Sequence, residues 1–224
     1  MLEVIGAEIE SKINEINEYL RLLTFLSRSE CIENQSEEKL MVDNHLIKTL
    51  KGSVFLLLYN LIEGTMRELV IAVHDSIAET QTPFDELRVE LQERIIKRAT
   101  GEGVGISEVL QKISGNISIN LHNATLSKKD IFSANIDHQE IQKVSKIYGF
   151  STATEFANTG HGRHLSKVKK LRNDLAHGNE TFATVGSRNT IEEINDICCE
   201  VTGYILGIFD NVVDCASNKN YARA

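Results

Sequence analysis

Apolar residues recur every three or four positions along most of the sequence, and this spacing constrains the fold more than any other feature. The first stretch contains Ile9, Ile13, Ile16, Leu20 and Leu23, spaced by four, three, four and three residues. Such spacing places the side chains on one face of an α-helix, which must pack against other helices to leave water. Proline, which interrupts helices, occurs only once in the chain, so long helices are possible. The sequence therefore predicts an all-α protein.

Capping residues and glycines set the expected helix boundaries. A first helix is expected at about 2–27, followed by a loop. Asn34 and Glu37 have the spacing of a capping box, so a long second helix is expected to begin there and continue to Val73. Further helices are expected at 84–99, 106–113, 137–148 and 161–177, with a last amphipathic helix after 190–193. The glycine-rich stretch 101–105 is a break, and 115–134 shows no clear pattern.

The length of 224 residues suits one domain with a real hydrophobic core. We expect a single domain over 1–224, in which 1–35 form the N-terminal helix and loop. Residues 36–216 would form the core bundle and 217–224 a frayed tail. The content of 42% hydrophobic and 25% charged residues excludes global disorder.

Several classes of site and location are not indicated. Acidic residues interrupt the N-terminal segment, unlike an export signal, and the most apolar run, Val54 to Ile62, is far shorter than the roughly 20 residues that cross a bilayer. We therefore expect a cytoplasmic protein without membrane contact. The cysteines lack metal-site or disulfide-framework spacing, and the glycines at 101–105 lack the strand and Lys-Ser/Thr of a phosphate loop. No metal and no cofactor are expected.

Basic residues are concentrated in one segment of an acidic chain. The net charge of −8 excludes a generic nucleic-acid-coating protein, because such proteins carry a basic excess. The local basic set is Arg163, His164, Lys167, Lys169, Lys170 and Arg172. Two interpretations of this set stay open: a local site for nucleic-acid phosphates, or a solvated helix face.

The end of the same segment combines side chains suited to acid–base chemistry. Gly178 is a helix stop, so His177 lies on the last turn of the expected helix, with Asn173 four positions before it on the same face. The long Arg172 side chain can reach the same space. A histidine that exchanges protons and a fixed cation suit metal-free RNA cleavage. From the residues alone, an alternative remains: Arg172 and Asp174 as helix-surface pairing residues and His177 as a simple cap.

The arrangement Arg172-Asn173-x-x-x-His177 resembles the Arg-x4-6-His signature of the HEPN superfamily. The segment LRNDLAHGNETFATVG resembles stand-alone bacterial members from toxin–antitoxin and phage-defence loci. Similar segments include LLLYNLIEGTMREL, GNISINLHN and IQKVSKIYGFS, so the resemblance covers most of the chain after Met41. It implies a HEPN-like up-and-down helical bundle with extra helices, which dimerises through the motif-bearing helices.

The resemblance also implies an activity and roles for residues. It implies a metal-independent endoribonuclease that cuts RNA, with tRNA as a candidate substrate, by attack of the ribose 2′-hydroxyl. The implied catalytic set is Arg172, His177, Asn173 and Glu63. The candidate substrate-binding set comes from the basic segment and consists of Arg163, Lys167, Lys169, Lys170 and Asp174, with pairing to Lys170 as the alternative role of Asp174. Many members restrained by a nucleotidyltransferase carry a tyrosine two residues after the histidine, where this chain has Asn179. An antitoxin or partner protein from a neighbouring gene would have to block the cleft or act through another site.

Two further alternatives stay open. The first is a non-catalytic HEPN module that binds nucleotide, RNA or protein within a larger defence complex, because one fold can carry different functions. The second is a metal shared by His161 and His164, three positions apart, although no acidic or cysteine ligand lies nearby in the sequence to complete it.

Overall fold

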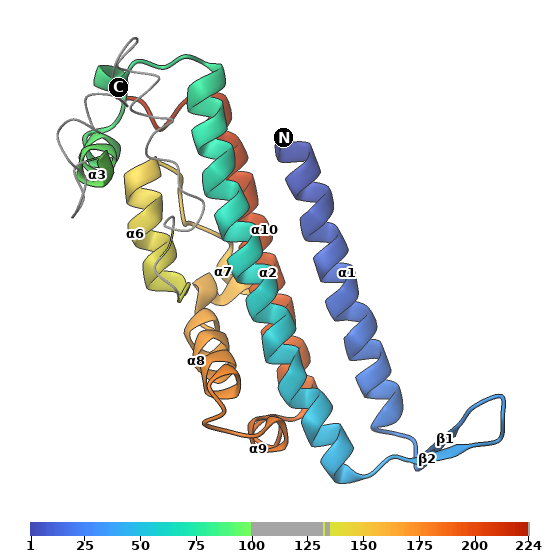
Figure 1. The fold of residues 1–224 in the computed structure, drawn as a ribbon. Helices are drawn as coiled ribbons and strands as arrows, with labels where there is room; N and C mark the ends of the chain where they lie inside the picture. The colour runs from blue at the N-terminus through green and yellow to red at the C-terminus, as the bar shows by residue number, and fades with distance from the viewer. Residues whose placement is uncertain (100–131, 133–134, 224) are drawn as a thin grey trace. The chain divides into compact units, whose positions relative to one another are not determined.

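The computed structural model describes residues 1–99, 132 and 135–223, and these residues are mostly helical (Figure 1). The longer helices are α1 (Leu2–Leu26), α2 (Asn44–Glu79), α3 (Val89–Ala99), α6 (His138–Tyr148), α8 (Leu165–Ala176) and α10 (Ile191–Asn218). The short ones are α7 (Phe156–Thr159), α9 (Phe182–Gly186) and the 3-10 turns η1 (Phe84–Glu86) and η3 (Gly160–Gly162). The strands found in the described ranges are β1 (Cys31–Glu33) and β2 (Lys39–Met41), which pair as an antiparallel hairpin. The predicted helical class is confirmed.

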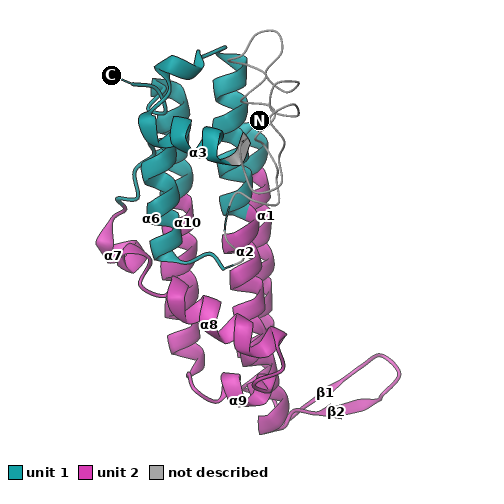
Figure 2. Cartoon of the chain, turned by 60° about the vertical axis from the view of Figure 1, so that its left-hand side comes forward, with its two compact units in different colours: residues 1–5, 65–153, 207–224 teal, residues 6–64, 154–206 magenta. Residues whose placement is uncertain are grey.

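The chain divides into two compact units (Figure 2). Unit 1 consists of Met1–Ile5, Thr65–Ala153 and Gly207–Ala224, and unit 2 of Gly6–Gly64 and Thr154–Leu206. Helices α1, α2 and α10 contribute residues to both units. All the residues that the sequence singles out for chemistry belong to unit 2.

The core of unit 2 is formed by the apolar faces of α1, α2, α8 and α10. In α1, Ile9, Ile16 and Leu23 are at most 2% exposed, and their spacing of seven residues keeps them on one face. The buried residues of α2, α8 and α10 in this unit include Val54, Phe55, Leu58, Leu61, Ile62, Leu165, Val168, Leu171, Ile194, Val201 and Ile205. Each such side chain stabilises the fold by about 1.5–3 kcal/mol relative to an exposed position.

Two glycines allow α9 to pack directly against the backbone of α2. A Cβ atom on Gly186 would lie 1.8 Å from the carbonyl oxygen of Lys48, and one on Gly52 would lie 2.3 Å from the carbonyl oxygen of Phe182. Thr181 caps α9, because its Oγ1 accepts a hydrogen bond from the backbone N–H of Thr184 at 3.1 Å. The backbone contact fixes α9, which follows the end of α8 in the sequence.

The predicted start of the second helix is wrong. Asn34 forms the turn of the hairpin instead, because its Oδ1 accepts hydrogen bonds from the backbone N–H groups of Ser36 at 2.8 Å and Glu38 at 3.0 Å. Asn and Asp side chains serve both turns and helix starts, so the spacing alone did not separate the two. Helix α2 begins at Asn44 after Asp43, whose Oδ1 accepts from the backbone N–H of Leu46 at 2.7 Å.

The C-terminal residues belong to unit 1 and are held in place. Tyr221 is fully buried, with its hydroxyl 3.2 Å from Ser76 Oγ and 3.1 Å from Thr80 Oγ1. The backbone N–H of Arg223 donates to the carbonyl of Glu86 at 2.7 Å. The expected frayed tail is therefore wrong for 217–223, because a buried aromatic ring and a backbone hydrogen bond anchor it.

Of the other helices expected from the sequence, those at 84–99 and 137–148 lie within the described residues. Asp137 caps α6 by accepting from the backbone N–H of Glu140 at 3.0 Å, and Gly149 ends it with a φ of 87°. The expected helix at 84–99 becomes η1 and α3, joined through Leu87 and Arg88. The helix expected at 106–113, the break at 101–105 and nearly all of 115–134 lie outside the described residues. Within the described part of the chain, no helix is long and apolar enough to cross a membrane.

Candidate functional site

Helix α8 begins after a tight turn that the sequence pattern did not reveal. Gly160, His161 and Gly162 have φ values of 51°, 51° and 76°, which no α-helix tolerates, so the helix starts at Leu165 and not at 161. A Cβ atom on Gly160 would lie 2.3 Å from Glu200 Oε2 of α10. The turn can lie this close to α10 because glycine occupies that position.

The end of α8 matches the expectation from the sequence. His177 is the C-cap, and its backbone N–H donates to the carbonyl of Asn173 at 3.0 Å. Gly178 follows with a φ of 69°, and its N–H donates to the carbonyl of Leu175 at 3.2 Å. The side chain of His177 is exposed and that of Asn173 is half-buried. The imidazole therefore lies at the C-terminus of α8 and is open to a ligand from solvent.

Arg172 is held against α2. The centre of its guanidinium lies 3.5 Å from the centroid of the Tyr59 ring, and its Nη2 donates to Glu63 Oε2 at 3.3 Å. The Arg172 side chain is 19% exposed and that of Glu63 is 31% exposed. The Nε atom of Arg172 is buried and has no hydrogen-bond partner among the described residues. The guanidinium is thus fixed by one ring and one carboxylate and remains partly open.

Lys170 and Asp174 form an ion pair along the surface of α8. The Lys170 Nζ lies 2.6 Å from Asp174 Oδ2, as expected for residues four positions apart in a helix. The hydrogen bond from Lys170 lowers the pKa of the Asp174 carboxyl, and Asn179 and Arg188 act in the same direction. The backbone carbonyl of Asp174 also accepts from the N–H of Asn179 at 2.9 Å. Asp174 therefore helps to hold the loop that follows His177.

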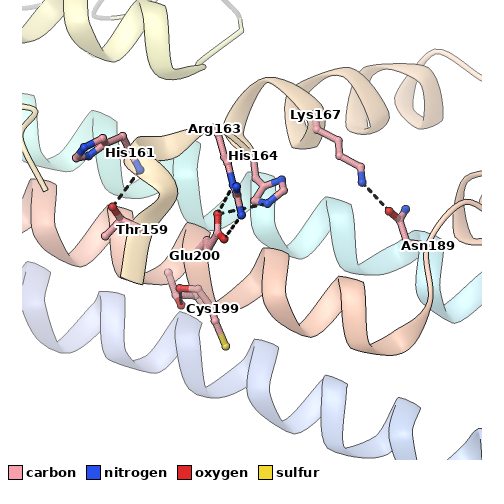
Figure 3. A network of polar contacts seen from close by, with 9 residues as sticks. Thr159, His161, Arg163, His164, Lys167, Asn189, Cys199 and Glu200 are labelled. Carbon is pink, nitrogen blue, oxygen red and sulfur yellow. Dashed lines mark hydrogen bonds and ion pairs between the residues drawn. The ribbon is translucent and has the colours of Figure 1, made fainter. Parts of the chain in front are cut away.

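The start of α8 is attached to α10 by a network around Glu200 (Figure 3). Arg163 donates two hydrogen bonds to the Glu200 carboxylate, of which the one from Nε to Oε2 measures 2.8 Å. His164 Nε2 lies 3.3 Å from the same Oε2. Burial lowers the pKa of His164 and Glu200 opposes that shift, while Arg163 and Lys167 add to the lowering. The Glu200 carboxylate thus contacts two residues of the predicted basic set, Arg163 and His164.

The remaining basic residues also have neighbours. Lys167 is exposed, and its Nζ donates to Asn189 Oδ1 at 2.6 Å (Figure 3). Lys169 is half-buried. The structure therefore does not present the basic set as one uninterrupted surface of free cations. It brings Arg172 together with Glu63, pairs Lys170 with Asp174, and ties Arg163 to α10.

His161 and His164 have separate environments. The backbone N–H of His161 donates to Thr159 Oγ1 at 3.1 Å, and its exposed ring packs edge-on against Phe156. His164 contacts Glu200 as described above. In the ranges that the structure covers, no group of three or more His, Cys, Asp and Glu residues is arranged to hold a metal ion.

Three residues near the site were not found from the sequence: Tyr59, Asn189 and Glu200. Each lies far along the chain from its partner: Tyr59 on α2 contacts Arg172 on α8, and Glu200 on α10 binds Arg163, which precedes α8. The helical spacing of Tyr59 and Glu63, four positions apart on α2, was the available signal. Only the folded structure shows that both side chains meet Arg172.

A family model of a HEPN-like domain matches residues 1–221 of the chain. The chain therefore belongs to this HEPN family and has the HEPN helical fold. The searches of curated proteins and of solved structures give no significant match.

Proposed function

We propose that this HEPN protein is a metal-independent endoribonuclease with Arg172 and His177 at its reaction centre. The observation that carries the proposal is a guanidinium on α8 that Tyr59 and Glu63 fix while leaving it partly exposed, with the exposed His177 at the end of the same helix. Membership of the HEPN family supports it, because HEPN domains are often ribonucleases.

The proposed reaction is an internal transesterification of RNA. The ribose 2′-hydroxyl loses its proton to a base and attacks the neighbouring phosphorus. The bond from phosphorus to the 5′-oxygen breaks, and that oxygen takes a proton from an acid. The products are a 2′,3′-cyclic phosphate and a 5′-hydroxyl, so no water or other reactant is consumed. Arg172 would stabilise the extra negative charge on the phosphorus oxygens in the transition state.

His177 can supply one of the two proton transfers in a single chain. We propose that the protein acts as a homodimer through its motif-bearing helices, so that His177 of a second copy supplies the other transfer. Asn173 would orient the imidazole and Glu63 would hold Arg172 until the phosphate arrives. A carboxylate that shares the guanidinium keeps it in place in the absence of substrate.

Lysines on α8 are the proposed contacts to flanking phosphates. Lys167 and Lys170 are exposed and are held by an amide and a carboxylate that a phosphate can replace. Lys169 and Arg163 would add positive charge nearby, and Asp174 would set the position of Lys170. Such a local set suits an acidic chain that binds RNA only at its site.

The biological setting is proposed from the family resemblance alone. We infer a cytoplasmic role in a toxin–antitoxin or phage-defence system, with tRNA as a candidate substrate. An antitoxin or partner protein from a neighbouring gene would restrain the activity. Because position 179 is an asparagine, that restraint would cover the site or act through another residue.

The experiment compares cleavage of labelled RNA by purified wild-type protein, His177→Ala and Arg172→Ala. His45→Ala and Arg21→Ala are matched controls, because both residues are exposed and lie outside the proposed site. Each site variant should lose about a hundredfold or more in rate, whereas the controls should cleave like the wild type. Circular dichroism should show the same helix content in all five proteins.

Full cleavage by both site variants would refute the assignment of Arg172 and His177. RNA binding without cleavage by the wild-type protein would instead favour the non-catalytic HEPN module that the sequence left open. In that case Arg172→Ala should weaken RNA binding, and the loss should grow smaller at high salt.

A further inference from the structure

We infer that Tyr59 is a positioning residue for the Arg172 guanidinium, an inference that rests on the proposed nuclease function. Tyr59 lies on α2, one turn before Glu63, and its ring faces the guanidinium at 3.5 Å. The two α2 residues therefore hold Arg172 from different directions: the ring covers one flat face, and the carboxylate receives an N–H at the edge.

The burial of these groups shows why the ring matters. Tyr59 is 1% exposed, so its ring is fixed by the core and cannot follow a moving arginine. The Nε of Arg172 is buried without a hydrogen-bond partner among the described residues, so hydrogen bonds do not define the plane of the guanidinium by themselves. A cation stacked on an aromatic face keeps its orientation while its edge stays free for an anion.

This arrangement favours arginine over lysine at position 172. A planar guanidinium can lie flat on the ring and still direct N–H groups toward both Glu63 and a phosphate, whereas an ammonium is a point charge without a preferred plane. A cation held in one orientation loses less freedom when the transition state forms. The ring should therefore affect kcat more than KM.

The first test measures cleavage by Tyr59→Phe and Tyr59→Leu. Tyr59→Phe keeps the ring and should retain wild-type kcat within about threefold. Tyr59→Leu keeps an apolar side chain without a π-face and should lower kcat by about fivefold to thirtyfold, with little change in KM. Tyr204→Leu is the matched control, because Tyr204 is a fully buried tyrosine on α10 in the same unit.

Tyr204→Leu should lose thermal stability as Tyr59→Leu does but should keep its kcat at the assay temperature. Wild-type kcat in Tyr59→Leu, or equal kcat losses in the two leucine variants, would overturn the inference.

A second test uses free guanidinium ion at a millimolar, non-denaturing concentration. Arg172→Ala leaves space beside the ring and Glu63, so guanidinium should restore part of its cleavage. It should restore none in the double variant Arg172→Ala/Tyr59→Leu, because the stacking surface is gone. An equal response of the two proteins to guanidinium, including no response in either, would overturn the positioning role.

The contact itself can be tested without RNA. In urea unfolding, Arg172→Met and Tyr59→Leu should be non-additive, with the double variant less destabilised than the sum of the single variants. Additive effects would overturn the stacking contact. An inactive wild-type protein with non-additive stabilities would refute only the proposed function, so the two failures are distinguishable.

Discussion

Replacing Gly186 with alanine should destabilise the protein strongly, because there is no room for one methyl group between α9 and α2. The new Cβ would lie 1.8 Å from the Lys48 carbonyl oxygen and 2.8 Å from the Gly52 backbone nitrogen. Both atoms are backbone atoms of α2, so no flexible side chain can move away. Helix α9 would have to retreat by about 1.5 Å to restore an ordinary contact distance.

The expected cost follows from what that retreat disrupts. Val185 is fully buried beside Gly186, so moving α9 opens space around it and strains the chain on both sides. Overpacking of a well-packed interior costs about 1–3 kcal/mol, and a clash with backbone belongs at the upper end, about 3 kcal/mol. Gly178→Ala is the control: nothing lies within 4 Å of its added Cβ, so only the positive φ of 69° opposes it, at about 1–2 kcal/mol.

Urea unfolding followed by circular dichroism measures both variants. With an m-value of about 2 kcal/mol per molar urea, the unfolding midpoint should fall by about 1.5 M for Gly186→Ala and by about 0.5–1 M for Gly178→Ala. Equal shifts in the two variants would refute the steric reasoning. A Gly186→Ala midpoint equal to that of the wild type would show that α9 does not pack against α2 in this way.

Two predictions concern protonation. In Lys170→Met, the pKa of Asp174 should rise toward its ordinary value, because the hydrogen bond that lowers it is lost; an NMR titration of the carboxyl checks this. The lowered pKa of Asp174 means that its contribution to stability is present above the unfolded pKa and is lost as the pH falls through the folded pKa. In Glu200→Gln, the pKa of His164 should fall further below 6.5, because Glu200 is the main group opposing the effect of burial. An imidazole NMR titration in which it rises would contradict the geometry around Glu200. The lowered pKa of His164 means that folding favours its neutral form. Its contribution to the stability of the fold is therefore fully present above the unfolded pKa of about 6.5 and is lost as the pH falls through the lower folded pKa.

The sequence predicted those parts of the fold that depend on local patterns. Of the predicted stripe in α1, Ile9, Ile16 and Leu23 are buried and Ile13 and Leu20 are half-buried, and the caps at Asp137 and Gly149 define α6. The end of α8 at His177 was also predicted, because a glycine in the left-handed region marks it. These features depend only on residues within a few positions of one another.

The predictions from the sequence were wrong where one local pattern is compatible with two structures, or where a residue distant in the sequence determines the local structure. Asn34 suits a helix start and a hairpin turn equally, and the structure uses the turn. The tail is anchored by Tyr221, whose partners lie on α2, far along the chain.

The same limitation applied to the candidate site. The positions of Arg172 and His177 at the end of α8 were predicted from spacing, but their surroundings were not. The Glu200 carboxylate offsets the positive charge of Arg163, and the sequence of the basic segment alone could not predict this pairing. Likewise, the apolar run LLLYNL predicts that Tyr59 is a core residue, and only the structure shows that its ring contacts the Arg172 guanidinium.

The most direct test of the account is to identify the ends of the RNA fragments that the wild-type protein and His177→Ala produce in EDTA. Transesterification with His177 as a proton-transfer group predicts fragments from the wild type that end in a 2′,3′-cyclic phosphate and begin with a 5′-hydroxyl, and a rate of fragment formation about a hundredfold or more lower for His177→Ala. Fragments with 5′-phosphate ends, or the same cleavage by His177→Ala, would contradict it.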